Sequence, residues 1–215
     1  MPYRETDATR RRAEERRASL LTAARALVAR HGFAGAKVSA IADAAGTSTG
    51  LVYSYFDHRD ELLATVFRES ASHELAMTRQ ATTASGPQAP DRLDTFIRTF
   101  AGRALRGPRL AWALLFEPVS PLVESERLVY RRAYIDIAEQ LVRDGIDSGA
   151  FTAQHPGVSG AATIGAISES LVGRLNPLGH DSLDGLPDET IVDDIVRYCH
   201  RALGAPVLEP KETSR

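Results

Sequence analysis

The sequence predicts an all-α protein, with an N-terminal three-helix head and a C-terminal helical body, about nine helices in all. Apolar side chains recur at helical spacing along most of the 215 residues. Breakers rich in Gly and Pro, such as 84–90 (ASGPQAP) and 107–108, separate these stretches. Two short helical segments within residues 38–56 are a third indication, because a turn containing Gly joins them.

The first long helix is expected to open with a basic run and to end at Gly32, since glycine commonly terminates helices. Phe33, directly after it, is expected to fill the core of the head. Glu14 and Glu15 lie among the arginines, so the run is either a solvated helix face or a contact for phosphates and the minor groove. The basic run consists of Arg10, Arg11, Arg12, Arg16 and Arg17, and the buried stripe of Leu20, Ala24, Leu27 and Val28.

Residues 38–56, VSAIADAAGTSTGLVYSYF, form the clearest motif in the chain. Gly46 is expected to end the first short helix, because glycine readily adopts the left-handed conformation of a C-terminal cap. The hydroxyl residues 47–49 are suited to cap the second short helix. This pattern is that of a helix-turn-helix, whose second helix enters the major groove of DNA. It therefore predicts binding to double-stranded DNA.

Four segments in order resemble the tetracycline-repressor (TetR-type) family of transcriptional regulators. They are 23–33 (AARALVARHGF), 38–46 (VSAIADAAG), 50–56 (GLVYSYF) and 59–63 (RDELL), within about the first third of the chain. The resemblance implies a DNA-binding head, an effector pocket in the body and a dimer formed by the last two helices. This chain has Lys37, Thr49 and Leu51 where the family usually has Thr, a positively charged residue and Thr. It also has Ala40 in place of the Glu of a capping box.

Charge and composition fit this interpretation. Residues 1–60 hold 10 Lys and Arg against 7 Asp and Glu, whereas the rest holds 16 against 21. A basic front on an acidic body is a modest indication of DNA binding. No run approaches eighteen apolar residues, and the Arg-rich N-terminus lacks the apolar core of a secretory signal. With Cys199 as its single cysteine, the chain is expected in the reducing cytoplasm, without a membrane.

The expected DNA contacts lie on the second short helix and on basic residues near it. Hydroxyl groups can bond either phosphates or base edges, and Leu51 can contact a thymine methyl. Lys37 and Arg59 are expected to bind phosphates, whereas Val52 and Phe56 are assigned to the core. The full set is Arg10, Arg11, Lys37, Ser39, Thr47, Ser48, Thr49, Gly50, Leu51, Tyr53, Ser54, Tyr55 and Arg59.

A long helix over 57–83 is expected to connect the head to the body, where helices over 91–106, 108–116 and 123–148 follow. Aromatic side chains on these body helices are candidates for an apolar effector pocket, and a few polar residues for orienting the effector. Taken singly, each is equally well explained as core or surface. The candidates are Phe96, Phe100, Trp112, Phe116, Glu117, Tyr130, Arg131, Tyr134 and Glu169.

The last two helices, over 156–175 and 188–203, flank a loop at 176–187 and are expected to form a homodimer. The first carries Gly and Ala on one surface, which permits close approach of another helix. The second is apolar on two sides, of which one serves the core and the other needs a partner. Together they predict a four-helix bundle across a twofold axis. The expected interface comprises Gly160, Ile164, Ile167, Leu171, Ile191, Ile195 and Tyr198.

No catalytic constellation is evident, so the chain is not expected to be an enzyme. The glycines of 157–165 lack the preceding strand and the Lys-Ser/Thr ending of a phosphate loop. The six histidines lack metal-ligand spacing, and Cys199 lies in an apolar stripe typical of an inert thiol. No cofactor and no metal are therefore expected.

Together these observations predict a ligand-responsive transcriptional regulator, more readily a repressor than an activator. A small apolar or amphipathic effector would release it from a palindromic operator. The alternative is a helical ligand-binding or scaffolding protein without DNA binding. The expected domains are an arm with the helix-turn-helix (1–56), a connecting helix (57–83), an effector-binding and dimerisation domain (84–205) and a disordered tail (206–215).

Overall fold

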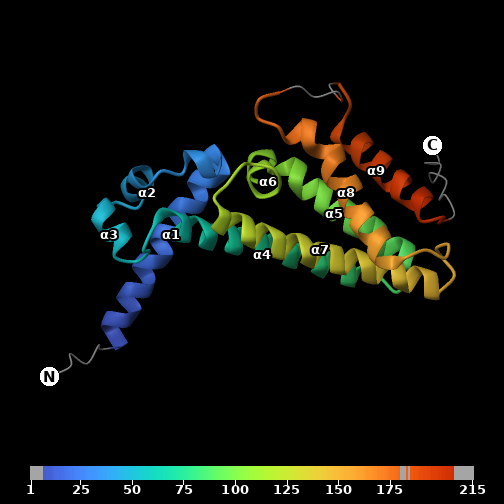
Figure 1. Ribbon diagram of the computed structural model, residues 1–215, viewed down its shortest axis with the longest axis horizontal. Helices are drawn as coiled ribbons and strands as arrows, with labels where there is room; N and C mark the ends of the chain where they lie inside the picture. Colours follow the sequence, from blue (N-terminus) through green and yellow to red (C-terminus); the bar gives the residue numbers. More distant parts are fainter. Residues whose placement is uncertain (1–6, 180–182, 184, 206–215) are drawn as a thin grey trace, which may run out of the picture. The chain divides into compact units, whose positions relative to one another are not determined.

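The computed structural model describes residues 7–179, 183 and 185–205, so the predicted tail and part of the loop at 176–187 lie outside the described residues. Within these ranges the chain forms nine α-helices (Figure 1). The predicted all-α class, with a helix-turn-helix followed by a helical body, is confirmed. The helices are α1 (Asp7–Gly35), α2 (Val38–Ala44), α3 (Thr49–Tyr53), α4 (Arg59–Ala84), α5 (Ala89–Arg106), α6 (Pro108–Leu115), α7 (Pro121–Asp147), α8 (Pro156–Leu175) and α9 (Asp188–Ala202).

The chain divides into two compact units. The first, called the head here, extends to Ser72 and also includes Arg109–Leu128, which hold most of α6 and the start of α7. The second, called the body, comprises His73–Pro108 and the chain from Val129 onward. This division differs from the expected boundaries after residues 56 and 83. Both α4 and α7 begin in the head and end in the body.

In the head, α1 contains a break at Gly32, whose φ of 72° and ψ of 179° are not helical. Glycine adopts such a positive φ at no steric cost, so the regular part of α1 ends where the sequence predicted. The chain then makes one further helical turn to Gly35. Phe33 in that turn is buried, as expected, and stacks on Phe67 of α4 with 6.0 Å between ring centroids.

The helix-turn-helix follows directly from this turn. Figure 1 shows α2 and α3 beside α1, joined by a short turn. Gly46, in that turn, has a φ of 63°, which fits its expected role in ending α2. Ser48 caps α3, because its Oγ accepts a hydrogen bond from the Leu51 backbone N–H at 3.3 Å. Lys37 precedes α2 and forms no side-chain cap, as expected from its lack of a hydroxyl.

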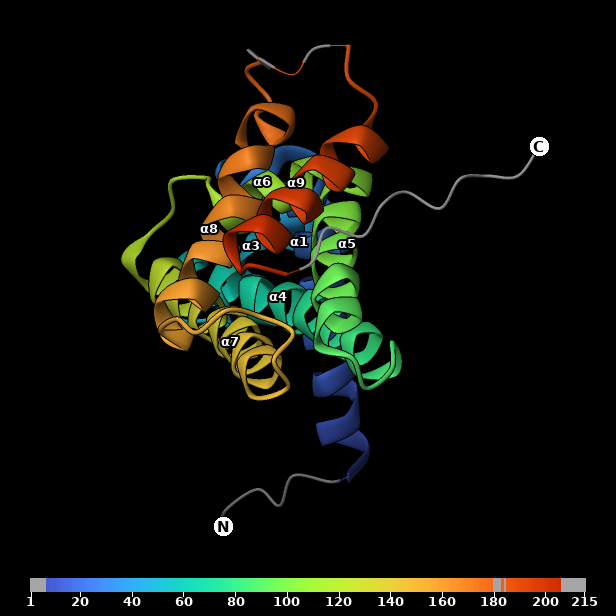
Figure 2. The ribbon, with the colours of Figure 1, turned by 90° about the vertical axis from the view of Figure 1, so that its right-hand side faces the viewer.

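In the body, α8 and α9 pack on each other and on α5, as Figures 1 and 2 both show. The core between them contains Leu93, Phe96 and Ile97 of α5 together with apolar residues of α8 and α9. Gly160 of α8 lies against the backbone of α7: a Cβ at this position would be 2.6 Å from the Glu139 nitrogen. None of the described helices combines the length and apolar character that crossing a bilayer requires.

Candidate nucleic-acid interface

The second helix of the motif, α3, presents its polar side chains to solvent and its apolar ones to the head core. Val52 and Phe56 are 1% and 2% exposed, so their assignment to the core is confirmed. Tyr53 is 52% exposed, and Thr49 and Gly50 beside it are also exposed. An exposed tyrosine on a short, capped helix is free to reach a groove or a phosphate.

The remaining side chains of this segment are less free. Thr47, Leu51 and Tyr55 are each partly buried, and Ser39 and Ser48 are exposed. The Ser54 hydroxyl donates a hydrogen bond to the Leu51 carbonyl at 2.7 Å. Because Ser48 and Ser54 both bond the α3 backbone, their first role is to fix the ends of the helix. Each hydroxyl oxygen can still accept a further hydrogen bond, for example from a base amino group of DNA.

Exposed basic residues precede α3 in the sequence. Arg10 and Arg11 are exposed on α1, and Lys37 is exposed directly before α2. Arg11 forms an ion pair with Glu15 at 3.7 Å, but both side chains are more than 65% exposed. Exposed pairs of this kind are weak and screened by salt, so the pair leaves Arg11 available to a phosphate.

The position of Arg59 does not support its expected role as a phosphate clamp. Its Nη2 donates to the Phe33 carbonyl at 2.6 Å, and its Nε donates to the Ala36 carbonyl at 3.2 Å. The third nitrogen lies 3.9 Å from Asp60. Arg59 therefore ties the start of α4 to the end of α1, because its guanidinium fork is satisfied by backbone carbonyls.

Arg17 is a basic side chain beside the motif that the expected set of DNA contacts omitted. Its guanidinium lies over the Phe56 ring, 5.0 Å from the centroid. This cation–π contact places a positive charge next to the segment that follows α3. The two residues are far apart in sequence, so only the basic run itself gave a signal for Arg17.

The expected effector residues fall into separate groups, one in each unit. In the body, the Tyr134 ring of α7 contacts the Phe100 ring edge-on, with 5.0 Å between ring centroids, and its centroid lies 6.4 Å from that of Phe96. Its hydroxyl forms a hydrogen bond with Thr78 of α4, and burial raises the pKa of Tyr134 to about 12. Glu74 and Arg103 form a bidentate ion pair beside this cluster, and it raises the pKa of Arg103.

In the head, Trp112 and Phe116 contact each other with 5.4 Å between centroids. The expectation that Glu117 orients an effector is wrong, because its carboxylate is buried and bonded to the Phe33 and Ala34 backbone N–H groups. Of the other candidates, Tyr130 is partly buried, and Arg131 and Glu169 are exposed.

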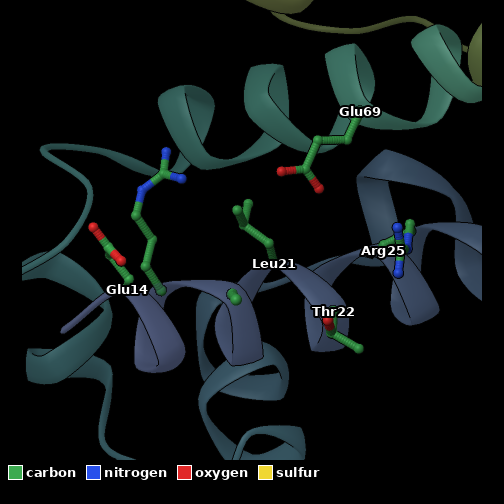
Figure 3. Close-up of a pocket in the computed structure, with 7 residues that line it drawn as sticks. Glu14, Leu21, Thr22, Arg25 and Glu69 are labelled. Atoms are coloured by element: carbon green, nitrogen blue, oxygen red, sulfur yellow. The ribbon is translucent and has the colours of Figure 1, made fainter. Parts of the chain in front are cut away.

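A cavity of about 270 Å³ lies on the head, between α1 and α4 (Figure 3). Glu69 extends from α4 toward Leu21 of α1, and Glu14 and Arg25 of α1 also line the cavity. The lining carries charges of both signs and includes none of the expected effector residues. This cavity therefore lends no support to the predicted pocket.

Most residues of the expected dimer interface are buried within the single chain, so their contact with a second copy stays a prediction. Ile167 and Leu171 are fully buried, and Gly160, Ile164, Ile191 and Ile195 are also buried. Helix α9 packs against α5 and α8. Tyr198 is the exception, with 63% of its surface exposed.

The titratable groups of α9 have no chemical partners suited to catalysis. Burial raises the pKa of the Cys199 thiol to about 11, as expected for an inert buried thiol. Burial lowers the pKa of His200, whose Nε2 has no hydrogen-bond partner among the described residues. Within the described ranges, no three His, Cys, Asp or Glu side chains cluster in a way that would hold a metal.

Comparisons with known proteins agree with the geometry of the head. Residues 20–66 match the model of the family described as bacterial regulatory proteins, tetR family. The chain is 30% identical over 144 residues to the HTH-type transcriptional repressor SCO4008 of Streptomyces coelicolor, covering 66% of this chain and 71% of that protein.

Solved structures of low sequence identity share the fold. The fatty acid degradation regulator FadR from Bacillus halodurans is 18% identical, with a TM-score of 0.71 over 89% of this chain and 97% of its own. FadR from Bacillus subtilis in complex with stearoyl-CoA is 20% identical, with a TM-score of 0.65 over 83% and 97%. At such identities the likeness establishes the fold alone.

Proposed function

Since the chain belongs to the TetR family of DNA-binding transcriptional regulators, which are not enzymes, we propose that it is a repressor released from a palindromic operator by a small effector. The observation that carries the proposal is the outward face of α3, where the exposed Tyr53 stands on a helix capped by Ser48. Its relative from Streptomyces coelicolor is named a repressor, which supports repression over activation. Occupying a promoter also needs no contact beyond those with DNA.

The experiment is to select binding sites for the wild-type protein from random duplex DNA and to titrate the selected duplex at several salt concentrations. Affinity should fall steeply with salt, because basic side chains of the head release counterions from phosphates. Tyr53→Ala should weaken binding to this duplex. Failure to select any sequence would favour the alternative, a helical ligand-binding or scaffolding protein without DNA binding.

A homodimer is part of the proposal, because two heads on a twofold axis would match a palindromic operator. Because most of the expected interface residues are buried within the single chain, we propose that its contacts come from exposed residues of α8. The exposed side of α8 offers Val158, 65% exposed, together with Ala161, Ala162 and Gly165. Small side chains on this side would let the helix of a second copy approach closely.

Ala162→Arg tests this interface, because a long charged side chain would hold the two α8 helices apart. Sedimentation should change from dimer to monomer, whereas Thr83→Arg, on an exposed position of α4, should leave the dimer intact. A dimer that persists in Ala162→Arg would place the interface elsewhere.

The proposed effector is amphipathic, with a long apolar part, and binds in the body near Tyr134. Phe96 and Phe100 form a buried apolar cluster with the Tyr134 ring, whose hydroxyl adds a polar group. Such a combination is typical of small-molecule sites. The fold shared with FadR from Bacillus subtilis, solved with stearoyl-CoA, suggests an acyl chain as the first probe.

Helix α4 supports a route from effector to DNA within one element. Its Arg59 bonds the end of α1, and its Thr78 bonds Tyr134. An effector that binds one position of α4 more tightly than another would change how the heads are spaced. It can do so only by its differential affinity for the two states.

Stearoyl-CoA, stearate and CoA should be added separately to the preformed complex of protein and selected duplex. Release by stearoyl-CoA or stearate, and weaker release from a Tyr134→Phe variant, would support the proposed site. Release by CoA alone would contradict an effector recognised by its apolar part.

A further inference from the structure

The break in α1 creates two backbone donors that the helix itself does not satisfy. After Gly32 the chain starts a new helical turn, and the first N–H groups of a helix have no acceptors within it. The N–H groups of Phe33 and Ala34 donate instead to the two carboxylate oxygens of Glu117, at 2.9 and 2.8 Å. Glu117 is only 8% exposed, and its bond to Phe33 is buried, whereas its bond to the exposed Ala34 is partly buried.

Gly32 leaves the space that this carboxylate occupies. A Cβ at Gly32 would be 2.5 Å from Glu117 Oε2 and 2.8 Å from Oε1. The positive φ of Gly32 turns the following N–H groups toward the same point. The carboxylate therefore needs glycine at position 32, because any side chain there would occupy its place. The glycine in turn directs the two N–H groups to the carboxylate.

Glu117 is itself held in place by the segment that carries it. The Arg127 guanidinium donates to the Glu117 carbonyl at 2.7 Å and to the Leu114 carbonyl at 3.0 Å. Burial is the main reason that the pKa of Arg127 is lowered, although Glu124 opposes this effect. At the start of α6, Arg109 donates to the Arg30 carbonyl at 3.3 Å. Residues 109–128 are thus attached to the end of α1 at two points.

The same short turn leads directly into the helix-turn-helix formed by α2 and α3. Phe33 and Ala36 accept hydrogen bonds from Arg59, and α2 begins at Val38. Three residues therefore separate Ala34, which Glu117 holds, from Val38 at the start of α2. The turn that Glu117 bonds is therefore joined to α2 by a short segment, which Arg59 also holds at Phe33 and Ala36.

We propose that Glu117 is a positioning residue for DNA binding, whose carboxylate fixes the turn from which α2 and α3 project. The segment 109–128 thereby sets the orientation of the reading helix without touching DNA. This inference rests on the proposed function. It differs from a purely stabilising role, which would lower the melting temperature and leave the affinity of the folded protein unchanged.

Glu117→Gln is the test, because the amide keeps the shape of the side chain but offers one acceptor in place of two. It should bind the duplex selected by the wild-type protein about tenfold more weakly, at a temperature where circular dichroism shows the variant folded. Hydrogen exchange at the Phe33 and Ala34 amides should accelerate. The salt dependence of binding should stay the same, because no phosphate contact is lost.

The sign of the effect separates positioning from electrostatics. Removing a negative charge near DNA strengthens binding by charge alone, so weaker binding by Glu117→Gln requires a geometric cause. Glu126→Gln is the matched control: it removes a carboxylate from the same segment, where Glu126 pairs with Arg68 instead of the turn. It should bind as tightly as the wild type or slightly more tightly.

Glu117→Asp provides a second variant if the amide does not fold, because its shorter side chain keeps the charge and reaches the two amides less well. It should also lose affinity and speed the exchange of Phe33 and Ala34. Unchanged affinity in a folded variant with faster exchange would overturn the inference while leaving the proposed function intact. Failure of the wild type to select DNA would refute the proposed function itself.

Discussion

The head and the body hold their helices by different kinds of contact. In the head, charged side chains bond backbone groups at helix ends: Glu117 bonds two N–H groups, and Arg59 bonds two carbonyls. In the body, α5, α8 and α9 pack through apolar faces. Ion pairs between them, such as Arg98 with Asp193, join exposed side chains.

The difference indicates how each unit responds to change. Hydrogen bonds are directional, so a few polar side chains define the orientation of the short helices α2 and α3. Apolar packing is spread over many residues, and no single one sets an orientation. We therefore expect single polar substitutions to alter DNA binding through the head, and core substitutions in the body to lower stability.

The largest effect is expected from Ile167→Ala, which empties a fully buried position of α8. It should lower the free energy of unfolding by about 2–5 kcal/mol, because the lost transfer energy is combined with a cavity. Urea denaturation measures this. Val129→Ala, at a 63% exposed position of α7, should change stability by less than about 0.5 kcal/mol.

Arg59→Ala tests the polar side of the comparison. It leaves the Phe33 and Ala36 carbonyls without their partner, so the free energy of unfolding should fall by about 1.5–3 kcal/mol. Because Arg59 is partly exposed, water replaces some of this loss, and the lower end of the range is expected. Tyr53→Ala should show the opposite pattern, with stability unchanged and affinity for the selected duplex reduced. Equal stability of both variants would contradict the structural role of Arg59.

Two glycines of α8 form a matched pair. Gly160→Ala places a methyl group against the backbone of Glu139 and should destabilise the protein by about 1–3 kcal/mol. In the single chain, Gly165→Ala meets nothing within 4 Å. In the Ala162→Arg background, where the proposed dimer is absent, it should stabilise the protein by about 0.5–1 kcal/mol, since alanine favours helix. In the dimeric protein the added methyl group should offset this gain, because a second copy packs against this side of α8. Thermal unfolding measures the stability of each variant, and equal stabilisation by Gly165→Ala in both backgrounds would contradict the proposed interface.

The smallest effect concerns pH. Burial lowers the pKa of His200 in the folded chain, where Asp94 and Asp91 oppose this effect and Arg98 adds to it. The unfolded chain therefore binds a proton first, and stability is lost as the pH falls below about 6.5. The slope should be at most about 1.4 kcal/mol per pH unit. Urea denaturation at pH 7.5 and 5.5 should show a smaller loss for His200→Gln, with the exposed His73→Gln as control.

Features that depend on residues close together along the chain could be predicted from the sequence. The turn at Gly46, the Ser48 cap and the inward face of α3 all followed from local spacing and residue type. The roles of Arg59 and Glu117 did not, because their partners are backbone atoms 23 to 84 residues away. The types and spacing of side chains do not show which distant backbone group a charged residue will bond. A charged residue in a region expected to bind DNA is easily assigned to phosphate.

Periodicity is also limited in what it predicts for α9. It shows that this helix has two apolar sides, but it does not show whether one chain can cover both. Here Ile191 and Ile195 on one side and Val192 and Val196 on the other are all buried within the single chain, where α9 packs on α5 and α8. The apolar residues therefore predicted burial correctly, whereas the element that covers each side could not be predicted from them.

The pairing of Gly32 with Glu117 has an evolutionary consequence. A side chain at position 32 would collide with the carboxylate, and without that carboxylate the two freed amides would lack an acceptor. In related repressors the two positions should therefore covary, so that a residue other than glycine at the first is accompanied by loss of the acidic residue at the second.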